Sequence, residues 1–119
     1  MKVAYVGAPY RADTEWGVEQ NIRAAEAIAR ALWQWGYAVV CPHLNSAHLG
    51  GLCPDETWLK GYLEILSRCD LFVAGNRWKT SEGTIDEIDR AEVLGIPVFY
   101  WACGGDQDWL RGNSREMVG

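Results

Sequence analysis

The chain has 119 residues, of which 49% are hydrophobic and 23% are charged, a composition typical of one globular domain. Its net charge of −5 argues against non-specific nucleic-acid binding, which needs clustered Lys and Arg. No apolar run approaches the roughly 20 residues of a membrane span. We therefore expect neither nucleic acid nor a membrane as a partner, whereas a small anion remains possible.

The cysteines and the N-terminus both predict a cytoplasmic protein. The segment 1–7 lacks a signal-peptide cleavage pattern and resembles a first strand. No pair of cysteines has the CxxC spacing, and most lie in or beside apolar segments, where a thiol behaves as a small hydrophobe. We predict that all of them are reduced, namely Cys41, Cys53, Cys69 and Cys103.

The first half of the chain alternates strand and helix patterns. A β-branched run over 2–8 predicts a buried strand that opens into a loop over 9–13. Apolar residues at helical spacing predict the longest helix over about 14–35, with Asp13 or Thr14 as its N-cap. A second strand follows over 37–41. The polar segment 42–48 cannot continue that strand, and we predict an active-site loop there.

The second half repeats this alternation. A helix is predicted from Asp55 to near Cys69, followed by a strand over 70–75 and a loop over 76–83. A short helix carrying Glu87 comes next and leads into a last strand over 96–100. The tail has no clear period, so we divide the chain into a domain over 1–101 and a flap or interface segment over 102–119.

Strands that alternate with helices of ten or more residues are typical of parallel sheets with crossover connections. The sequence therefore predicts an α/β fold, a small flavodoxin-like or Rossmann-like sheet with helices on both faces. The expected strand order is 2-1-3-4.

Glu87 stands out on the helix that precedes the last strand. At about 100° per residue it falls on the apolar half of the helix, between Ala91 and Leu94, so it is aimed toward the sheet. A carboxylate normally avoids burial, which makes this residue a candidate site. An inward Glu that only satisfies backbone donors at the helix N-terminus is an equally good interpretation.

In such a sheet, ligands bind beyond the carboxyl ends of the strands, near the switch point between strands one and three. That rule selects the loops 8–11, 42–45 and 76–83. Ser81 and Gly83 precede the helix that carries Glu87, and free amides there suit a phosphate or sugar oxygen, although both residues are also ordinary in turns and caps. Arg11 on the facing loop could clamp the same anion.

The sequence lacks the motifs of other common nucleotide-binding and metal-binding sites. There is neither a GxGxxG after the first strand nor a GxxxxGK[ST]. His43 and His48 have no third ligand in pattern, so we predict no metal and no other cofactor. A Cys–His nucleophile pair is not excluded, but each cysteine is better interpreted as a core residue.

Several segments, in the right order, resemble the nucleoside 2-deoxyribosyltransferase-like superfamily, and most closely its small DUF4406 branch. The resemblance spans about residues 2–101 and rests on these phrases: Tyr5-Val6-Gly7-Ala8-Pro9-Tyr10-Arg11, Asn21-Ile22-x-x-Ala25, Cys41-Pro42-His43-Leu44-Asn45, Leu63-Glu64-x-Leu66-x-x-Cys69-Asp70, Trp78-x-x-Ser81-x-Gly83 and Glu87-x-x-x-Ala91-x-x-x-Gly95-Ile96-Pro97-Val98.

The resemblance implies an enzyme that acts at the N-glycosidic bond of a deoxynucleoside or its monophosphate. Glu87 would attack the anomeric carbon and form a glycosyl-enzyme, and Tyr5 would orient that carboxylate. The resemblance also implies that Ser81, Gly83 and Arg11 hold a 5′-phosphate. The full set of substrate-binding residues expected from the matched loops is Gly7, Pro9, Tyr10, Arg11, His43, Asn45, Trp78, Ser81 and Gly83.

One position departs from the family pattern. Tyr62 stands where the family usually has a second acid, and a phenol with a pKa of about 10 cannot act as a carboxylate. We keep it as a third catalytic candidate. The alternative to an enzyme is a catalytically weak or inactive module that binds a nucleotide. The tryptophan-rich composition, including Trp101 and Trp109, favours a homo-oligomer.

Overall fold

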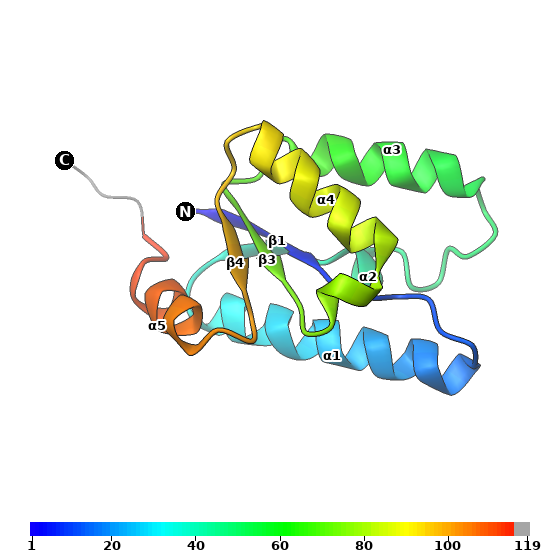
Figure 1. Cartoon of the computed structure of the whole chain (residues 1–119), viewed down its shortest axis with the longest axis horizontal. Helices are drawn as coiled ribbons and strands as arrows, with labels where there is room; N and C mark the ends of the chain where they lie inside the picture. The colour runs from blue at the N-terminus through cyan, green and yellow to red at the C-terminus, as the bar shows by residue number, and fades with distance from the viewer. Residues whose placement is uncertain (116–119) are drawn as a thin grey trace.

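The computed structural model describes residues 1–115, which form a parallel sheet between two layers of helices (Figure 1). The sheet has four strands in the order β2-β1-β3-β4, and every neighbouring pair is parallel. This confirms the predicted α/β fold and strand order. The strands are β1 (Val3–Gly7), β2 (Ala38–Val40), β3 (Leu71–Ala74) and β4 (Val98–Tyr100).

The helices begin and end close to the predicted positions. Thr14 is the N-cap of the longest helix, since its Oγ1 accepts a hydrogen bond from the Gly17 amide at 2.9 Å. Gly36, just beyond that helix, has a φ of 100°, which suits glycine. The helices are α1 (Glu15–Gln34), α2 (Pro42–Asn45), α3 (Asp55–Leu66), α4 (Glu82–Val93) and α5 (Gly104–Gly112), with a 3₁₀ turn η1 (Trp78–Thr80).

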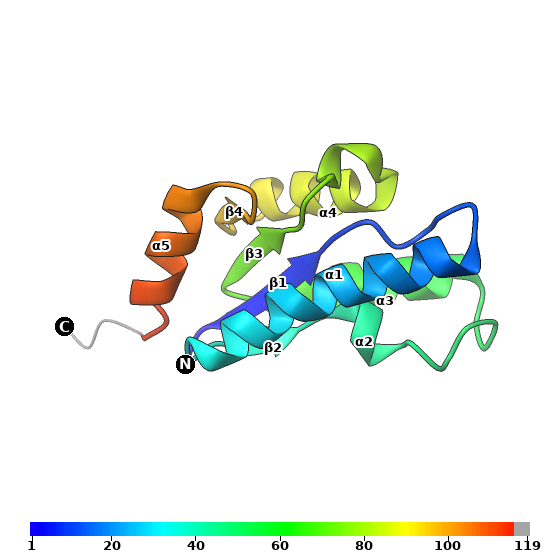
Figure 2. The same cartoon turned by 90° about the horizontal axis from the view of Figure 1, so that it is seen from below.

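Successive side chains along each strand point to opposite faces of the sheet, so the core has two halves. Ala4 and Val6 of β1 pack with α1 and α5 on one face, whereas Tyr5 packs with α3 and α4 on the other. Phe72 of β3 lies beside Tyr5, with the ring centroids 5.5 Å apart. Figure 1 shows the sheet between these layers, and Figure 2 looks from the side of α1 onto the strands in the order β2-β1-β3-β4. Because both faces are covered, the strands are apolar throughout.

Two segments differ from the prediction. The segment expected to be an active-site loop contains the single-turn helix α2, which starts at Pro42, a residue whose fixed φ suits a first helical position. The tail contains α5, whose Leu110 is fully buried in the core under α1. Tyr37 donates a hydrogen bond from its hydroxyl to the Leu110 carbonyl at 2.7 Å, so the first part of the tail belongs to the domain.

The molecule is elongated, with extents of 46 × 25 × 24 Å. The first turns of α1 and α3 project beyond the carboxyl ends of the strands, at the right of Figure 1. Among the described residues, no helix is both long and apolar enough to cross a membrane. The projecting turns leave an open space between them at the edge of the sheet where ligands of α/β proteins bind.

Candidate active site

A cleft of about 1260 Å³ lies between the projecting turns of α1 and α3. Its floor includes Tyr5 of β1 and Glu87 of α4. The loop after β1, the helix α2 and the start of α4 supply the rest of the wall. The volume exceeds what a nucleoside needs, since small-ligand pockets measure about 300–1,000 Å³.

Glu87 points inward, as the helical pattern predicts, and is partly buried in the cleft. Burial raises the pKa of its carboxyl from 4.5 to about 7, although the Tyr5 hydroxyl opposes this shift, and the nearby Asp86 charge makes a smaller contribution in the same direction as burial. A carboxyl with a pKa near neutrality exchanges its proton readily at physiological pH. Such groups are common in active sites.

Tyr5 is fully buried beneath Glu87. Burial and the neighbouring Glu87 charge raise the pKa of its hydroxyl far above the usual range, so the phenol stays protonated. Its hydroxyl has no hydrogen-bond partner of good geometry within the described part of the chain. The phenol is therefore close enough to Glu87 to favour the carboxylate, while the contact falls short of a well-formed hydrogen bond.

Tyr62 lines the cleft from α3, but its hydroxyl is engaged by α2. It donates to Ser46 Oγ at 2.8 Å and accepts from Asn45 Nδ2 at 3.2 Å. Ser46 in turn donates to the Pro42 carbonyl at 3.0 Å. These contacts join α3 to α2 across the wall of the cleft.

The start of α4 offers backbone donors to the cleft. Ser81 is the N-cap, and its Oγ accepts from the Thr84 amide at 3.2 Å and from the Thr84 hydroxyl at 2.9 Å. Glu82 and Gly83 line the cleft directly after this cap. A Cβ on Gly83 would meet no atom within 4 Å, so the residue leaves open space beside these donors. An anion fits there.

Two arginines line the same cleft. Arg11 forms a salt bridge with Asp55 at 2.7 Å across the mouth of the cleft, and both side chains are 82% exposed. Arg77 adopts a left-handed backbone with φ of 61°, which is uncommon for a residue with a side chain. Its guanidinium donates to Asn21 Oδ1 at 2.7 Å, and Asn21 Nδ2 donates to the Tyr10 carbonyl at 3.0 Å.

His43 is buried in the cleft wall and is neutral, because burial lowers its pKa. Its Nε2 lies 2.9 Å from the Pro9 carbonyl, so Nε2 carries the proton and Nδ1 is an acceptor. Within residues 1–115, Nδ1 has no hydrogen-bond partner. The ring also packs edge-on against Tyr10, with the centroids 5.4 Å apart.

Acids outnumber bases around the cleft. Arg11 and Arg77 are the only Lys or Arg side chains that line it within the described residues, and His43 is neutral. A negative field disfavours ionisation of Glu87 and stabilises positive charge that develops on a bound ligand. The lining acids are Asp13, Asp55, Glu56, Glu82, Asp86 and Glu87.

The structure brings together most of the predicted site residues, but three lie elsewhere. Gly7 is outside the cleft and allows β1 to pass the ring of Phe72, which a Cβ would overlap. Asn45 contacts Tyr62 behind the cleft wall, and Trp78 faces a neighbouring cavity. The residues that do line the cleft are Tyr5, Pro9, Tyr10, Arg11, His43, Tyr62, Ser81, Gly83 and Glu87.

Residues 2–101 match a protein family described as Domain of unknown function (DUF7768). The chain belongs to the DUF7768 family. The match covers all strands and every residue that lines the cleft, and it ends before α5. No curated protein matches the chain. What the cleft of this DUF7768 domain does must therefore follow from its own side chains.

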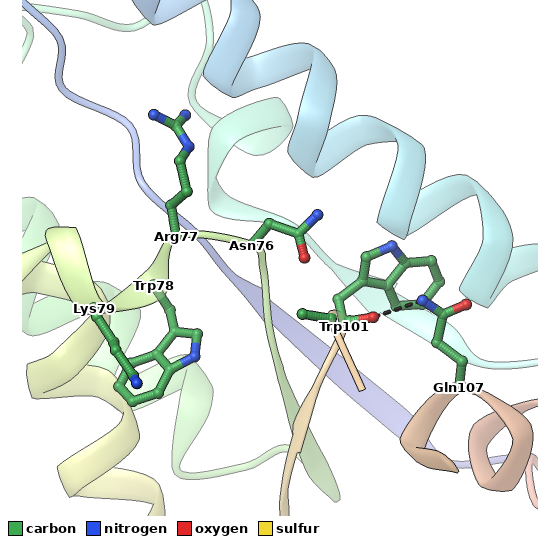
Figure 3. Close-up of a pocket in the computed structure, with 7 residues that line it drawn as sticks. Asn76, Arg77, Trp78, Lys79, Trp101 and Gln107 are labelled. Atoms are coloured by element: carbon green, nitrogen blue, oxygen red, sulfur yellow. Dashed lines mark hydrogen bonds between the residues drawn. The ribbon is translucent and has the colours of Figure 1, made fainter. Parts of the chain in front are cut away.

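A second cavity of about 520 Å³ lies on the other side of Arg77 (Figure 3). It is formed by the segment after β3 and by the start of the connection to α5, with Trp78 and Trp101 on opposite sides. In neither cavity, nor elsewhere in residues 1–115, do three His, Cys, Asp or Glu side chains gather as a metal site would require.

Proposed function

We propose that this DUF7768 protein cleaves, or transfers a sugar at, the N-glycosidic bond of a deoxynucleoside or nucleoside monophosphate, with Glu87 as the nucleophile. The observation that carries the proposal is the pairing of Glu87 with the buried Tyr5 hydroxyl on the floor of an acidic cleft. The resemblance to nucleoside 2-deoxyribosyltransferases supports the same roles for these two residues.

The chemistry suits this geometry. Loss of a base from a nucleoside passes through an oxocarbenium-like transition state, which the acids around Glu87 stabilise. The ionised carboxylate attacks the anomeric carbon as the bond to the base breaks, the base leaves with the electron pair of that bond and takes a proton from water, and a glycosyl ester forms. Water or a second base then takes the sugar and regenerates Glu87.

The rest of the cleft fits a nucleotide. The backbone N–H groups of Glu82 and Gly83, at the start of α4, suit a 5′-phosphate. Trp58 and Tyr10 provide aromatic surface against which a base can stack.

Tyr62 favours a second candidate function, a module that binds the nucleotide with little turnover. A tyrosine whose hydroxyl already donates to Ser46 is a poor general acid for the leaving base. A missing general acid typically costs about 10²- to 10⁴-fold in rate. Under this alternative the protein binds its ligand as well as an enzyme does but releases base slowly.

One experiment separates the two candidates. The protein is incubated with the four deoxynucleoside monophosphates, free base is measured by chromatography, and binding is measured by calorimetry. The enzyme proposal expects base release that Glu87→Gln lowers by several orders of magnitude while binding persists. Glu92→Gln, an exposed position on the same helix, is the control. Base release at the wild-type rate from Glu87→Gln would reject the nucleophile assignment.

The expected setting is the cytoplasm and the expected assembly is a homo-oligomer. Trp16 and Trp33 of α1 are 58% and 56% exposed, more apolar surface than a small monomer usually leaves in water. Light scattering at micromolar concentration should give a mass of at least twice 13.3 kDa. A monomeric mass under those conditions would reject the assembly.

A further inference from the structure

The second cavity has the size of a ligand site but no part in the reaction proposed above. Its volume of about 520 Å³ falls within the usual range of about 300–1,000 Å³. It opens at the carboxyl ends of β3 and β4, at the same edge of the sheet as the cleft that holds Glu87.

Its walls are aromatic and held firmly. Trp78 packs on Tyr100 with ring centroids 5.1 Å apart, and Trp101 stacks on Trp35 at 5.6 Å. Figure 3 shows Asn76 between the two indoles, with its carboxamide directed away from the strand. A carboxamide that both donates and accepts, set between aromatic walls, matches the edge of a planar heterocycle such as a nucleobase.

The rim of the second cavity is basic. Lys79 lies over the Trp78 ring at 5.5 Å, and no residue lining this cavity in the described chain is acidic, although the protein carries a net charge of −5. Arg77 is the one described residue that lines both this cavity and the cleft. One residue therefore lies between an acidic cleft and a basic cavity.

The left-handed backbone at Arg77 explains this arrangement. It turns the Arg77 side chain toward Asn21 of α1, whereas the neighbouring Asn76 and Trp78 face the second cavity (Figure 3). Within the described residues, the Arg77 guanidinium donates one hydrogen bond, which goes to the Asn21 side chain. The group has five N–H donors, so the others can bind a phosphate that lies beside it in the cleft.

We infer that the ligand is a dinucleotide. One nucleoside lies in the cleft with its anomeric carbon at Glu87, the linking phosphate lies at Arg77, and the second base lies between Trp78 and Trp101. The position of the nucleoside at Glu87 rests on the proposed function. The inference adds the substrate class of that site, a dinucleotide. Pyrophosphate-linked and phosphodiester-linked dinucleotides share this chemistry.

The test compares ligands of increasing length by calorimetry, using Glu87→Gln so that turnover does not interfere. The probes are deoxyadenosine monophosphate, the phosphodiester dinucleotide d(pApA) and the pyrophosphate-linked nicotinamide–adenine dinucleotide. We expect one of the dinucleotides to bind at least tenfold more tightly than the monophosphate. Which of them does so identifies the linkage.

Variants of the second cavity supply the decisive comparison. Asn76→Ala and Lys79→Gln should each remove at least fivefold of the dinucleotide affinity while the affinity for the monophosphate changes less than twofold. Lys60→Gln, on α3 and outside both cavities, is the matched control and should change neither. Circular dichroism and a thermal melt check that each variant is folded.

The outcomes distinguish the two proposals. Equal affinity for mononucleotide and dinucleotide, or equal loss of both in Asn76→Ala, would overturn the dinucleotide inference and leave the N-glycosidase proposal standing. Tight dinucleotide binding without any base release from the wild type would support the second cavity and reject the enzyme. If neither class of ligand binds, both proposals fail.

Discussion

Glu87 is costly to keep ionised within the cleft, because burial and Asp86 both disfavour its charge. Its pKa is about 7 in the folded protein against 4.5 when unperturbed, so the folded state binds more protons between these pH values. The free energy of unfolding must therefore fall as the pH rises from 4.5 to 7. The loss amounts to at most about 3 kcal/mol.

Glu87→Gln should remove this dependence. We expect the variant to be more stable than the wild type at pH 8, by up to about 3 kcal/mol, and equally stable at pH 4. Urea unfolding at the two pH values measures the difference. The exposed Glu92→Gln should leave both values unchanged. A variant that is less stable than the wild type at pH 8 would show that Glu87 is held by favourable contacts instead.

Tyr5 offers a second test at the same site. The hydroxyl lowers the pKa of Glu87, so Tyr5→Phe should raise that pKa and move the lower limb of the pH profile of base release to higher pH. Tyr37→Phe removes another buried hydroxyl, which donates to Leu110 far from the cleft. It should lower stability by about 1–3 kcal/mol but leave the profile in place. Identical profiles for all three proteins would exclude the orienting role of Tyr5.

The sequence predicted these residues unevenly, for physical reasons. Glu87 was predicted because its position on the wheel depends only on helical period, and the structure has it facing the cleft. Arg77 and Asn21 were missed as a pair, because they are 56 residues apart and a left-handed backbone at a non-glycine residue leaves no pattern. Gly7 was assigned to the site although contact with Phe72 already requires glycine there.

At the scale of elements, α5 is the main difference from the sequence prediction. Its glycines disfavour a helix, and Trp109 and Leu110 alone give no period, so local sequence did not predict it. Tertiary contacts form it instead. Trp109 stacks on Phe99 at 4.8 Å, and the carboxylate of Asp106 accepts a hydrogen bond from the Tyr100 amide of β4 at 2.7 Å.

Leu110→Ala should therefore destabilise the whole domain, although the residue lies beyond the family match. A buried Leu replaced by Ala costs about 2–5 kcal/mol, because the hydrophobic contact is lost and a cavity remains. Asp108→Ala on the exposed side of the same helix should change the stability by less than about 0.5 kcal/mol. Chemical denaturation measures both. If Leu110→Ala had no larger effect than Asp108→Ala, α5 would be an appendage and not part of the core.

Across the whole molecule, the starts of α1 and α3 project from the sheet at the carboxyl ends of the strands (Figure 1). The strands and their order were predictable, because buried parallel strands read as apolar runs and crossover connections restrict their order. The distance between the starts of α1 and α3 was not predictable from the sequence, because it depends on the hydrogen bond by which Tyr62 joins α3 to the segment after α2. The width of the cleft is thus a tertiary property.

The salt bridge between Arg11 and Asp55 joins these two projecting parts at the mouth of the cleft. Asp55→Asn should shorten the residence time of a bound nucleoside, because ligand escape no longer waits for the bridge to open, and association should accelerate equally. Stopped-flow fluorescence measures both rates, with Glu64→Gln, which removes an exposed ion pair on α3 outside the cleft, as the control. Because both side chains are exposed, salt weakens the bridge. The wild type in concentrated salt should therefore exchange a neutral nucleoside as quickly as Asp55→Asn does, so that ionic strength controls the speed of ligand exchange more than its equilibrium.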